Sequence, residues 1–260
     1  MTQTCYPIRE LPWDTELFGF KMGEVLLHTG IESHAYNPQK WRNTMEMARR
    51  QSYKFLLCRV DARCQDITDS LIGQGAKIGD TLITLELNLS TTTVMDAAAT
   101  AELPLAGLQI LAADSRDLPV ICDIAAESFS YSRIYQDSRF DPTKARQFYP
   151  KWIRESYGNT ERVYIVKEKS FNENILGFIA LQFQEAEHRV VIRLIAIDKL
   201  HRGKGYGQVM MDWLIREAKA KGFHRIQVGT QNANTGALHL YEKNGFRPLS
   251  AKHRLHIWLD

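Results

Sequence analysis

The stretch that most constrains this chain is a glycine-rich, basic turn at residues 202–207, Arg-Gly-Lys-Gly-Tyr-Gly. It follows the apolar, β-branched run 189–197. It leads into residues 208–220, whose apolar side chains recur at helical spacing. A strand, a tight turn and an amphipathic helix in this order predict a βα unit whose helix packs on a sheet.

The turn has the composition of an anion site. Glycines at 203, 205 and 207 leave no Cβ atoms to obstruct inward-pointing backbone N–H groups. The start of the helix adds unpaired N–H groups and the positive end of the helix dipole, a combination that binds phosphate. Lys204 is followed by glycine, which excludes a P-loop, and the last glycine of a Rossmann fingerprint is missing. Arg202 and Lys204 add positive charge.

The composition excludes several classes of protein. Hydrophobic residues make up 44% and charged residues 24% of 260 residues, and the net charge of +3 is too small to argue for nucleic acid. Four cysteines without a CxxC pair argue against a zinc site and against a disulfide framework. There is no apolar run of membrane-spanning length and no signal-peptide pattern. We therefore expect a cytoplasmic protein with reduced thiols and no metal, nucleic acid or membrane partner.

Residues 89–106 divide the chain. They hold few charges and many Ser, Thr and Ala residues, which predicts a linker between an N-terminal α/β domain (1–88) and a larger second domain (107–260). The alternative is an Ala-rich surface helix.

The second domain alternates strand and helix patterns, which predicts a mixed α/β (α+β) sheet flanked by helices. A helix over 116–129 is expected to be capped by Asp114 or Ser115, and Pro150 is expected to kink or break a helix over 141–157. Gly222 occupies the position of a left-handed helix C-cap. The predicted strands are 108–112, 162–168, 175–183, 189–197, 225–230 and 254–259.

Residues 55–87 repeat the strand–helix–strand order of residues 226–259. We interpret the first region as part of a related half that has no glycine turn and no ligand site. The alternative is coincidence, because strand–helix–strand is a common order.

The spacing Arg-x-x-Gly-x-Gly, the preceding strand RLIAI (193–197) and the later segment NANTGALHLYEKNGF (232–246) occur in one order. Together they resemble the acyl-CoA pyrophosphate turn of the GCN5-related N-acetyltransferases (GNAT) over residues 107–260. The resemblance implies a GNAT fold, and the N-terminal domain is then a degenerate half-GNAT. The alternative is a glycine turn needed only for packing.

The resemblance also implies an N-acetyltransferase that uses acetyl-CoA as co-substrate and no metal. Tyr241 matches the tyrosine near the thioester sulfur and becomes the expected general acid; the alternative is a core tyrosine. The N–H of Ile197 is expected to hold the thioester oxygen. Glu185, Glu187 and His188 leave the general base undecided. The cofactor-binding residues implied are Ile195, Ala196, Ile197, Arg202, Gly203, Lys204, Gly205, Tyr206, Gly207, Gln208 and Asn234.

Two further stretches, LPWDTELFGF (11–20) and residues 128–153, resemble the TDP-fucosamine acetyltransferases. This implies direct acetylation of the 4-amino group of a TDP-linked 4-amino-4,6-dideoxyhexose in surface-polysaccharide biosynthesis. Substrate-binding candidates are Arg133, Tyr135 and Arg139, with Lys144 and Arg146 as further cations and Tyr131 and Phe140 as stacking rings.

Other readings stay open. The chain could acetylate a protein or another small-molecule amine, or it could be a non-catalytic acyl-CoA sensor. The expected partner is a nucleotide-linked amino sugar, and a homodimer is left open. The sequence leaves the exact sugar, the nucleotide and the acyl chain undecided.

Overall fold

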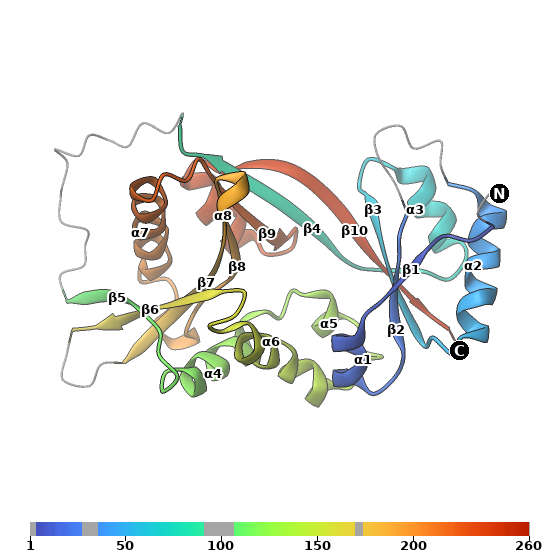
Figure 1. Cartoon of the computed structure of the whole chain (residues 1–260), viewed down its shortest axis with the longest axis horizontal. Coiled ribbons are helices and arrows are strands. Elements are labelled where there is room, and N and C mark those ends of the chain that lie inside the picture. The colour runs from blue at the N-terminus through green and yellow to red at the C-terminus, as the bar shows by residue number, and fades with distance from the viewer. Residues whose placement is uncertain (1–3, 28–35, 91–106, 170–173, 260) are drawn as a thin grey trace.

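The computed structural model describes residues 4–27, 36–90, 107–169 and 174–259. These residues form one ten-stranded sheet with helices packed on its faces (Figure 1). The strands are β1 (Ile8–Glu10), β2 (Met22–Val25), β3 (Phe55–Asp61), β4 (Lys77–Asn88), β5 (Leu108–Ala112), β6 (Arg162–Glu168), β7 (Ile175–Gln184), β8 (Arg189–Ile197), β9 (Arg225–Gln231) and β10 (Arg247–Trp258). The helices are α1 (Pro12–Phe18), α2 (Pro38–Arg50), α3 (Gln65–Ile72), α4 (Leu118–Ser128), α5 (Arg133–Gln136), α6 (Pro142–Ser156), α7 (Tyr206–Ala220) and α8 (Thr235–Lys243), with short 3₁₀ turns η1 (Glu185–Glu187) and η2 (Lys199–His201).

The sheet has the strand order β1-β2-β3-β10-β4-β9-β8-β7-β6-β5. Each half of the chain contains a parallel pair joined through a helix, β2 and β3 through α2 and β8 and β9 through α7. A short helix and a last strand follow in each half. The last strands are exchanged, because β4 pairs with β9 and β10 pairs with β3, while β4 and β10 pair with each other. Figure 1 shows β4 and β10 running together from one half to the other.

The strand–helix–strand order predicted for 55–87 and 226–259 is therefore present, in the form of a reciprocal strand exchange. Both halves contribute to one sheet, so neither completes its own part of the sheet alone. The division into domains 1–88 and 107–260 stays a prediction, since residues 91–106 of the predicted linker lie outside the described residues. Leu89 is buried, and its N–H donates to the carbonyl of His224 at 2.8 Å.

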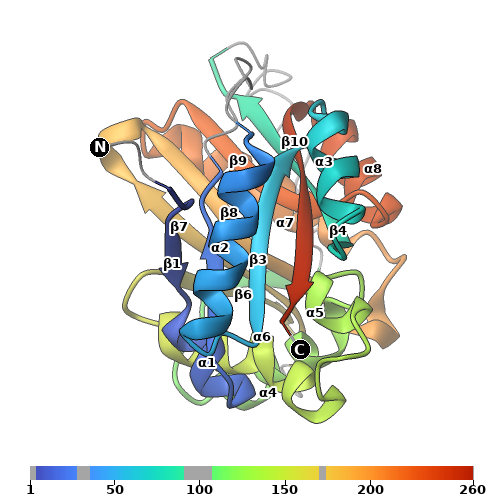
Figure 2. The same ribbon diagram turned by 90° about the vertical axis from the view of Figure 1, so that its right-hand side faces the viewer.

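Three apolar cores hold the helices on the sheet. Helices α4 and α6 cover one face of β6–β8 and bury Ile121 and Ile153 completely, whereas α7 and α8 cover the opposite face through Met210. In the N-terminal half α2 and α3 pack on β3 and β10 around Trp41 (Figure 2). Each large apolar side chain buried in this way contributes about 1.5–3 kcal/mol.

One local prediction, the capping residue of α4, was wrong, and the break that was one of two alternatives predicted at Pro150 is absent. Helix α4 begins after Asp117, whose carboxylate accepts the N–H of Asp114 and pairs with Lys167, so neither Asp114 nor Ser115 caps the helix. Helix α6 continues through Pro150 without a break. Gly222 has φ +76°, as predicted for a left-handed C-cap, and the following N–H of Phe223 donates to the carbonyl of Ala218.

All four cysteines are free thiols, and burial raises the pKa of Cys58 and Cys122 above the ordinary value. No helix within the described ranges is long and apolar enough to cross a membrane. Across the same ranges, no group of three or more His, Cys, Asp or Glu residues could hold a metal ion.

Candidate active site

Strands β8 and β9 diverge along their length. They are paired only over their first four residues, Arg189–Ile192 with Arg225–Val228. Beyond this point β8 stays on β7 as far as Ile197, whereas β9 stays on β4 as far as Gln231. A bulge in the β7–β8 pairing falls at Arg193, where the strands part. The divergence leaves a backbone edge of β8 that an extended ligand can pair with.

The outward groups on this edge follow from the hydrogen-bond pattern. The N–H of Asp198 donates to the carbonyl of Leu176 on the β7 side at 2.9 Å. In an antiparallel ladder the bonded residues alternate, so the N–H and C=O groups of Ile197 and Ile195 point away from β7, into the gap. By the same alternation the backbone groups of Ala196 face β7, and this residue offers the gap no backbone hydrogen bond.

The glycine turn lies at the end of this edge. Gly203 and Gly205 have φ +76° and +88°, which other residues rarely adopt, and Gly205 is the N-cap of α7. The first bonded N–H of the helix is that of Val209, to the carbonyl of Gly205, so the N–H groups of residues 206–208 precede the helical ladder. The Arg202 guanidinium donates to the carbonyl of Ile197 at 3.0 Å and to Ser128 Oγ at 3.1 Å. These contacts fasten the turn to β8 and α4.

Helix α8 brings Asn234 and Tyr241 to the same gap. Asn234 is the N-cap, and its side chain accepts the N–H of Ala237 at 3.2 Å. The Tyr241 ring is buried against Phe246, and no hydrogen-bond partner for its hydroxyl is found among the described residues. Burial raises the pKa of Tyr241 above its ordinary value, so the phenol keeps its proton at neutral pH.

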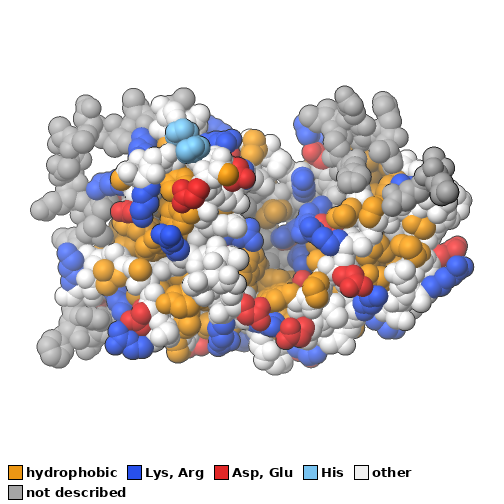
Figure 3. All heavy atoms as spheres, viewed as in Figure 1, with side chains coloured by type: hydrophobic (Ala, Val, Ile, Leu, Met, Phe, Trp, Pro, Cys, Tyr) orange, Lys and Arg blue, Asp and Glu red, His pale blue; other side chains and the backbone are white. Residues whose placement is uncertain are grey.

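A cavity of about 1210 Å³ joins these parts. Its lining includes the outward end of β8, the glycine turn, Asn234 and Tyr241, and it extends along β9 and β4 to the N-terminal half. Figure 3 shows Lys and Arg side chains gathered in the hollow between the two halves. The cavity is therefore built by both halves of the shared sheet.

A comparison with family models identifies the family of the region that contains this site. Residues 129–246 match the acetyltransferase (GNAT) family. These residues form a GNAT-family domain. The divergent strands, the glycine turn and the α8 tyrosine described above all lie inside the matched range.

Curated relatives match about half of the chain at modest identity. The spore coat polysaccharide biosynthesis protein SpsD of Bacillus subtilis is 28% identical over 142 residues, 55% of this chain and 48% of that protein. The dTDP-fucosamine acetyltransferase of Escherichia coli O6:H1 is 27% identical over 133 residues, 51% of this chain and 56% of that protein. The chain thus spans about half the length of these relatives.

A solved structure extends the likeness to nearly the whole chain. A GCN5-related N-acetyltransferase from Sphaerobacter thermophilus superposes with a TM-score of 0.64 at 10% identity, covering 92% of this chain and 73% of that one. The predicted fold, a GNAT-type mixed sheet flanked by helices with an additional N-terminal region, is confirmed.

Most of the predicted cofactor residues of the GNAT domain lie together. Ile195, Ala196, Ile197, Arg202, Gly203, Gly205, Tyr206, Gly207 and Asn234 all line the cavity. Lys204 and Gln208 are absent from this lining. Lys204 is exposed, and the Gln208 side chain bonds to Asp212 and Asn244. The predicted contact of these two residues with the cofactor stays a prediction, and their backbone groups would make it.

The residues predicted to bind the acceptor do not all line the cavity. Arg133 lines the cavity, but Tyr135 and Arg139 do not. The Tyr135 hydroxyl donates to the carbonyl of Ala126, and burial raises the pKa of Tyr135 to about 12. Arg139 lies over the Trp258 ring at 5.5 Å.

Of the further candidates for acceptor binding, only Tyr131 lines the cavity. Phe140 is a buried core ring. Lys144 Nζ donates to the carbonyl of Phe18 at 2.8 Å, and Arg146 pairs with Glu127.

The undecided base candidates lie at a hairpin tip. Glu185 and Glu187 belong to η1 and His188 follows it with φ +46°, and all three are exposed and outside the cavity lining. The carboxylates that do line the cavity are Asp14 and Glu155.

Sequence reasoning missed the charged residues that the N-terminal half and the exchanged strand β10 contribute. Arg59 on β3, Arg254 on β10 and Asp14 on α1 all line the cavity. A signal was present, because Arg59 interrupts the apolar run Phe55–Val60, whose other members are buried. An arginine inside a buried strand needs a partner, and only the folded sheet identifies it.

Proposed function

We propose that this chain is an N-acetyltransferase that transfers an acetyl group from acetyl-CoA directly to a primary amine. One observation carries the proposal. Strands β8 and β9 diverge just before a glycine turn that opens α7, and Tyr241 lines the cavity they form.

The residues fit acetyl-CoA. The outward N–H and C=O groups of Ile195 suit the amide groups of a pantetheine arm, which would lie along β8 as an added strand, whereas the Ile197 carbonyl already accepts from Arg202. The N–H groups of residues 203–208 suit the pyrophosphate. Asn234, at the start of α8, lies beside this path and can contact the arm.

When bound, acetyl-CoA supplies an acetyl group activated as a thioester. The N–H of Ile197 can donate to the carbonyl oxygen as negative charge develops there. As the amine nitrogen bonds to the carbonyl carbon and the C–S bond breaks, the Tyr241 hydroxyl can protonate the departing sulfur, since its raised pKa keeps the proton available, and the proton that the amine loses restores the phenol. Burial also raises the pKa of Asp14, although Arg133 opposes this shift.

We further propose that the acceptor is the 4-amino group of a TDP-linked 4-amino-4,6-dideoxyhexose used in surface-polysaccharide biosynthesis. Similarity to the dTDP-fucosamine acetyltransferase of Escherichia coli supports this choice. So does the arginine-rich lining of the acceptor end, which suits a diphosphate better than the backbone of a protein substrate.

The test is release of free CoA thiol from acetyl-CoA with a panel of amines: TDP- and UDP-linked 4-amino-4,6-dideoxyhexoses, the free amino sugar, and a peptide amine. We expect the TDP-linked sugar to give the highest kcat/KM. Activity confined to the peptide would overturn the sugar proposal, and no thiol release with any amine would favour an acyl-CoA sensor.

A further inference from the structure

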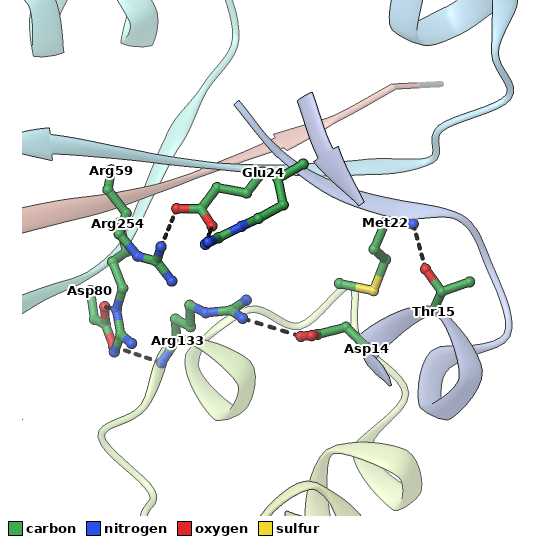
Figure 4. Close-up of polar contacts among 9 residues, drawn as sticks. Asp14, Thr15, Met22, Glu24, Arg59, Asp80, Arg133 and Arg254 are labelled. Atoms are coloured by element: carbon green, nitrogen blue, oxygen red, sulfur yellow. Dashed lines mark hydrogen bonds and ion pairs between the residues drawn. The ribbon is translucent and has the colours of Figure 1, made fainter. Parts of the chain in front are cut away.

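Two arginines face each other across neighbouring strands at the acceptor end of the cavity. Arg59 on β3 is the direct cross-strand partner of Arg254 on β10, so their side chains share one face of the sheet. Like charges directly opposite each other are destabilising unless something compensates them. Figure 4 shows both, with Arg133 of α5 close beneath them.

Arg133 has unused hydrogen-bonding capacity. Its side chain is 9% exposed, and Nη2 lies 3.4 Å from a carboxylate oxygen of Asp14. Its Nη1 is buried and has no hydrogen-bond partner among the described residues. The Arg133 backbone N–H donates to Asp80 at 2.8 Å, so the residue is held in place while one donor of its guanidinium stays unsatisfied.

The charges in this cluster do not balance. The guanidiniums of Arg9, Arg59, Arg133 and Arg254 pair with only three carboxylates, those of Asp14, Glu24 and Asp80. Burial raises the pKa of Asp14, which makes its negative charge harder to maintain. Arg9 is exposed and shares Glu24 with Arg59, so Arg59 is only partly neutralised, and an anionic ligand would offset its charge.

We infer that Arg59, Arg133 and Arg254 bind the diphosphate of a nucleotide-linked acceptor. Guanidiniums bind phosphate oxygens bidentately, and these three line the same cavity as Tyr241, the proposed general acid. The N-terminal half then supplies Arg59, and the exchanged strand β10 places Arg254 beside it, which gives the N-terminal half a part in acceptor recognition. The inference rests on the proposed function, because it assumes that the acceptor carries a diphosphate.

This site is separate from the glycine turn. The turn belongs to the β8–α7 junction, whereas Arg59 and Arg254 lie on β3 and β10 on the far side of β4 and β9 in the sheet order. A cavity with two anion sites can hold the pyrophosphate of CoA and the diphosphate of the acceptor together. The exchange of β4 and β10 between the halves makes this possible.

The experiment is calorimetric titration of thymidine diphosphate into protein already saturated with CoA, so that the glycine turn is occupied. Arg59→Gln removes the most exposed of the three cations, at 39% side-chain exposure. We expect it to weaken thymidine diphosphate binding roughly ten- to a hundred-fold. The matched control is Arg9→Gln, because Arg9 pairs with the same Glu24 carboxylate but lies outside the cavity lining. The affinity of this variant for thymidine diphosphate should equal that of the wild type.

Steady-state kinetics separate the acceptor from the cofactor. Arg59→Gln should raise KM for the nucleotide-linked amine by the same factor and leave KM for acetyl-CoA and for the free amino sugar unchanged. If Arg59→Gln proves unstable, Arg59→Lys keeps a cation for Glu24 and should weaken thymidine diphosphate several-fold.

The outcomes distinguish the two proposals. Equal thymidine diphosphate affinity in wild type and both Arg59 variants, or no binding to the CoA-saturated protein, would overturn the anion site. Transfer to the TDP-linked sugar with an unchanged KM in Arg59→Gln overturns the anion site alone. Tight, Arg59-dependent binding without transfer to any amine overturns the proposed function and leaves the site standing.

Discussion

Asp80 on β4 and Arg254 on β10 are direct cross-strand neighbours, and the guanidinium binds both carboxylate oxygens. Their side chains are only 4% and 15% exposed. Asp80 also accepts the backbone N–H of Arg133. This pair therefore joins the exchanged strands to α5 and fixes one wall of the cavity.

Breaking this pair should destabilise the protein strongly. Arg254→Met leaves the Asp80 carboxylate buried without its partner, which costs about 3–5 kcal/mol in comparable cases. The double variant Asp80→Asn/Arg254→Met removes the orphaned charge and keeps an acceptor for the Arg133 N–H, so it should be more stable than the single variant. Urea unfolding measures both free energies, and a double variant less stable than Arg254→Met would contradict this account.

Gly177 on β7 is expected to set the position of the cofactor-binding edge. A Cβ atom there would lie 2.5 Å from the carbonyl oxygen of Ala196 and 3.1 Å from the Cα of Ile197. Gly177→Ala must push this part of β8 away, which should cost about 1–3 kcal/mol of stability and weaken acetyl-CoA binding. The control is Gly73→Ala, whose Cβ would approach no atom closer than 3.4 Å. Unchanged acetyl-CoA affinity in Gly177→Ala would show that the edge position is not critical.

Gly205 tests the phosphate role of the turn. Its φ is +88° and a Cβ would meet nothing within 4 Å, so Gly205→Glu adds backbone strain and a negative charge without a clash. Repulsion of the CoA pyrophosphate should abolish measurable acetyl-CoA binding in calorimetry. Gly75→Glu is the matched control, because Gly75 has φ +92°, equally open surroundings and a place outside the cavity lining. Similar losses in both variants would mean that strain, not charge, is responsible.

Tyr241 tests the general acid. Tyr241→Phe keeps the buried ring and removes the hydroxyl, and general acid catalysis is typically worth about 10²–10⁴-fold. We expect kcat to fall within that range with little change in acetyl-CoA affinity. Tyr157→Phe provides the control, since that hydroxyl donates to the carbonyl of Ala113 outside the cavity lining. Full turnover in Tyr241→Phe, with chemistry rate-limiting, would reduce Tyr241 to a core residue.

Asp137 makes stability depend on pH. Burial would raise its pKa, but hydrogen bonds from His256 Nδ1 at 2.6 Å and Trp258 Nε1 at 2.9 Å outweigh this effect and hold it below the ordinary value. A carboxylate with a lowered folded pKa stabilises the protein above its unfolded pKa of about 3.9, and this contribution is lost as the pH falls below it. Asp137→Asn should therefore cost about 1.5–3 kcal/mol at pH 7 and progressively less towards pH 3. Unfolding free energies of both proteins across this range check it, and a constant difference would contradict it.

The sequence determined the local structure of the proposed cofactor site. Glycine spacing and the following amphipathic run predicted the turn and α7, because left-handed backbone conformations and helical periodicity are properties of neighbouring residues. The segment 232–246 likewise predicted α8 with Asn234 at its start. Local propensity erred where a tertiary contact intervened, as at Asp117, whose carboxylate pairs with Lys167 of β6 and accepts the N–H of Asp114.

Only the tertiary structure decided how the two halves meet. The repeat of strand, helix and strand is visible along the chain, but no local pattern says that β4 and β10 exchange partners, because strand pairing between residues about 170 apart is set by the whole sheet. Arg59, Arg133 and Arg254 come together only through that exchange. Tyr135 turns elsewhere because the short helix α5 directs successive side chains to different sides, and Arg139 lies beyond the end of α5, over Trp258.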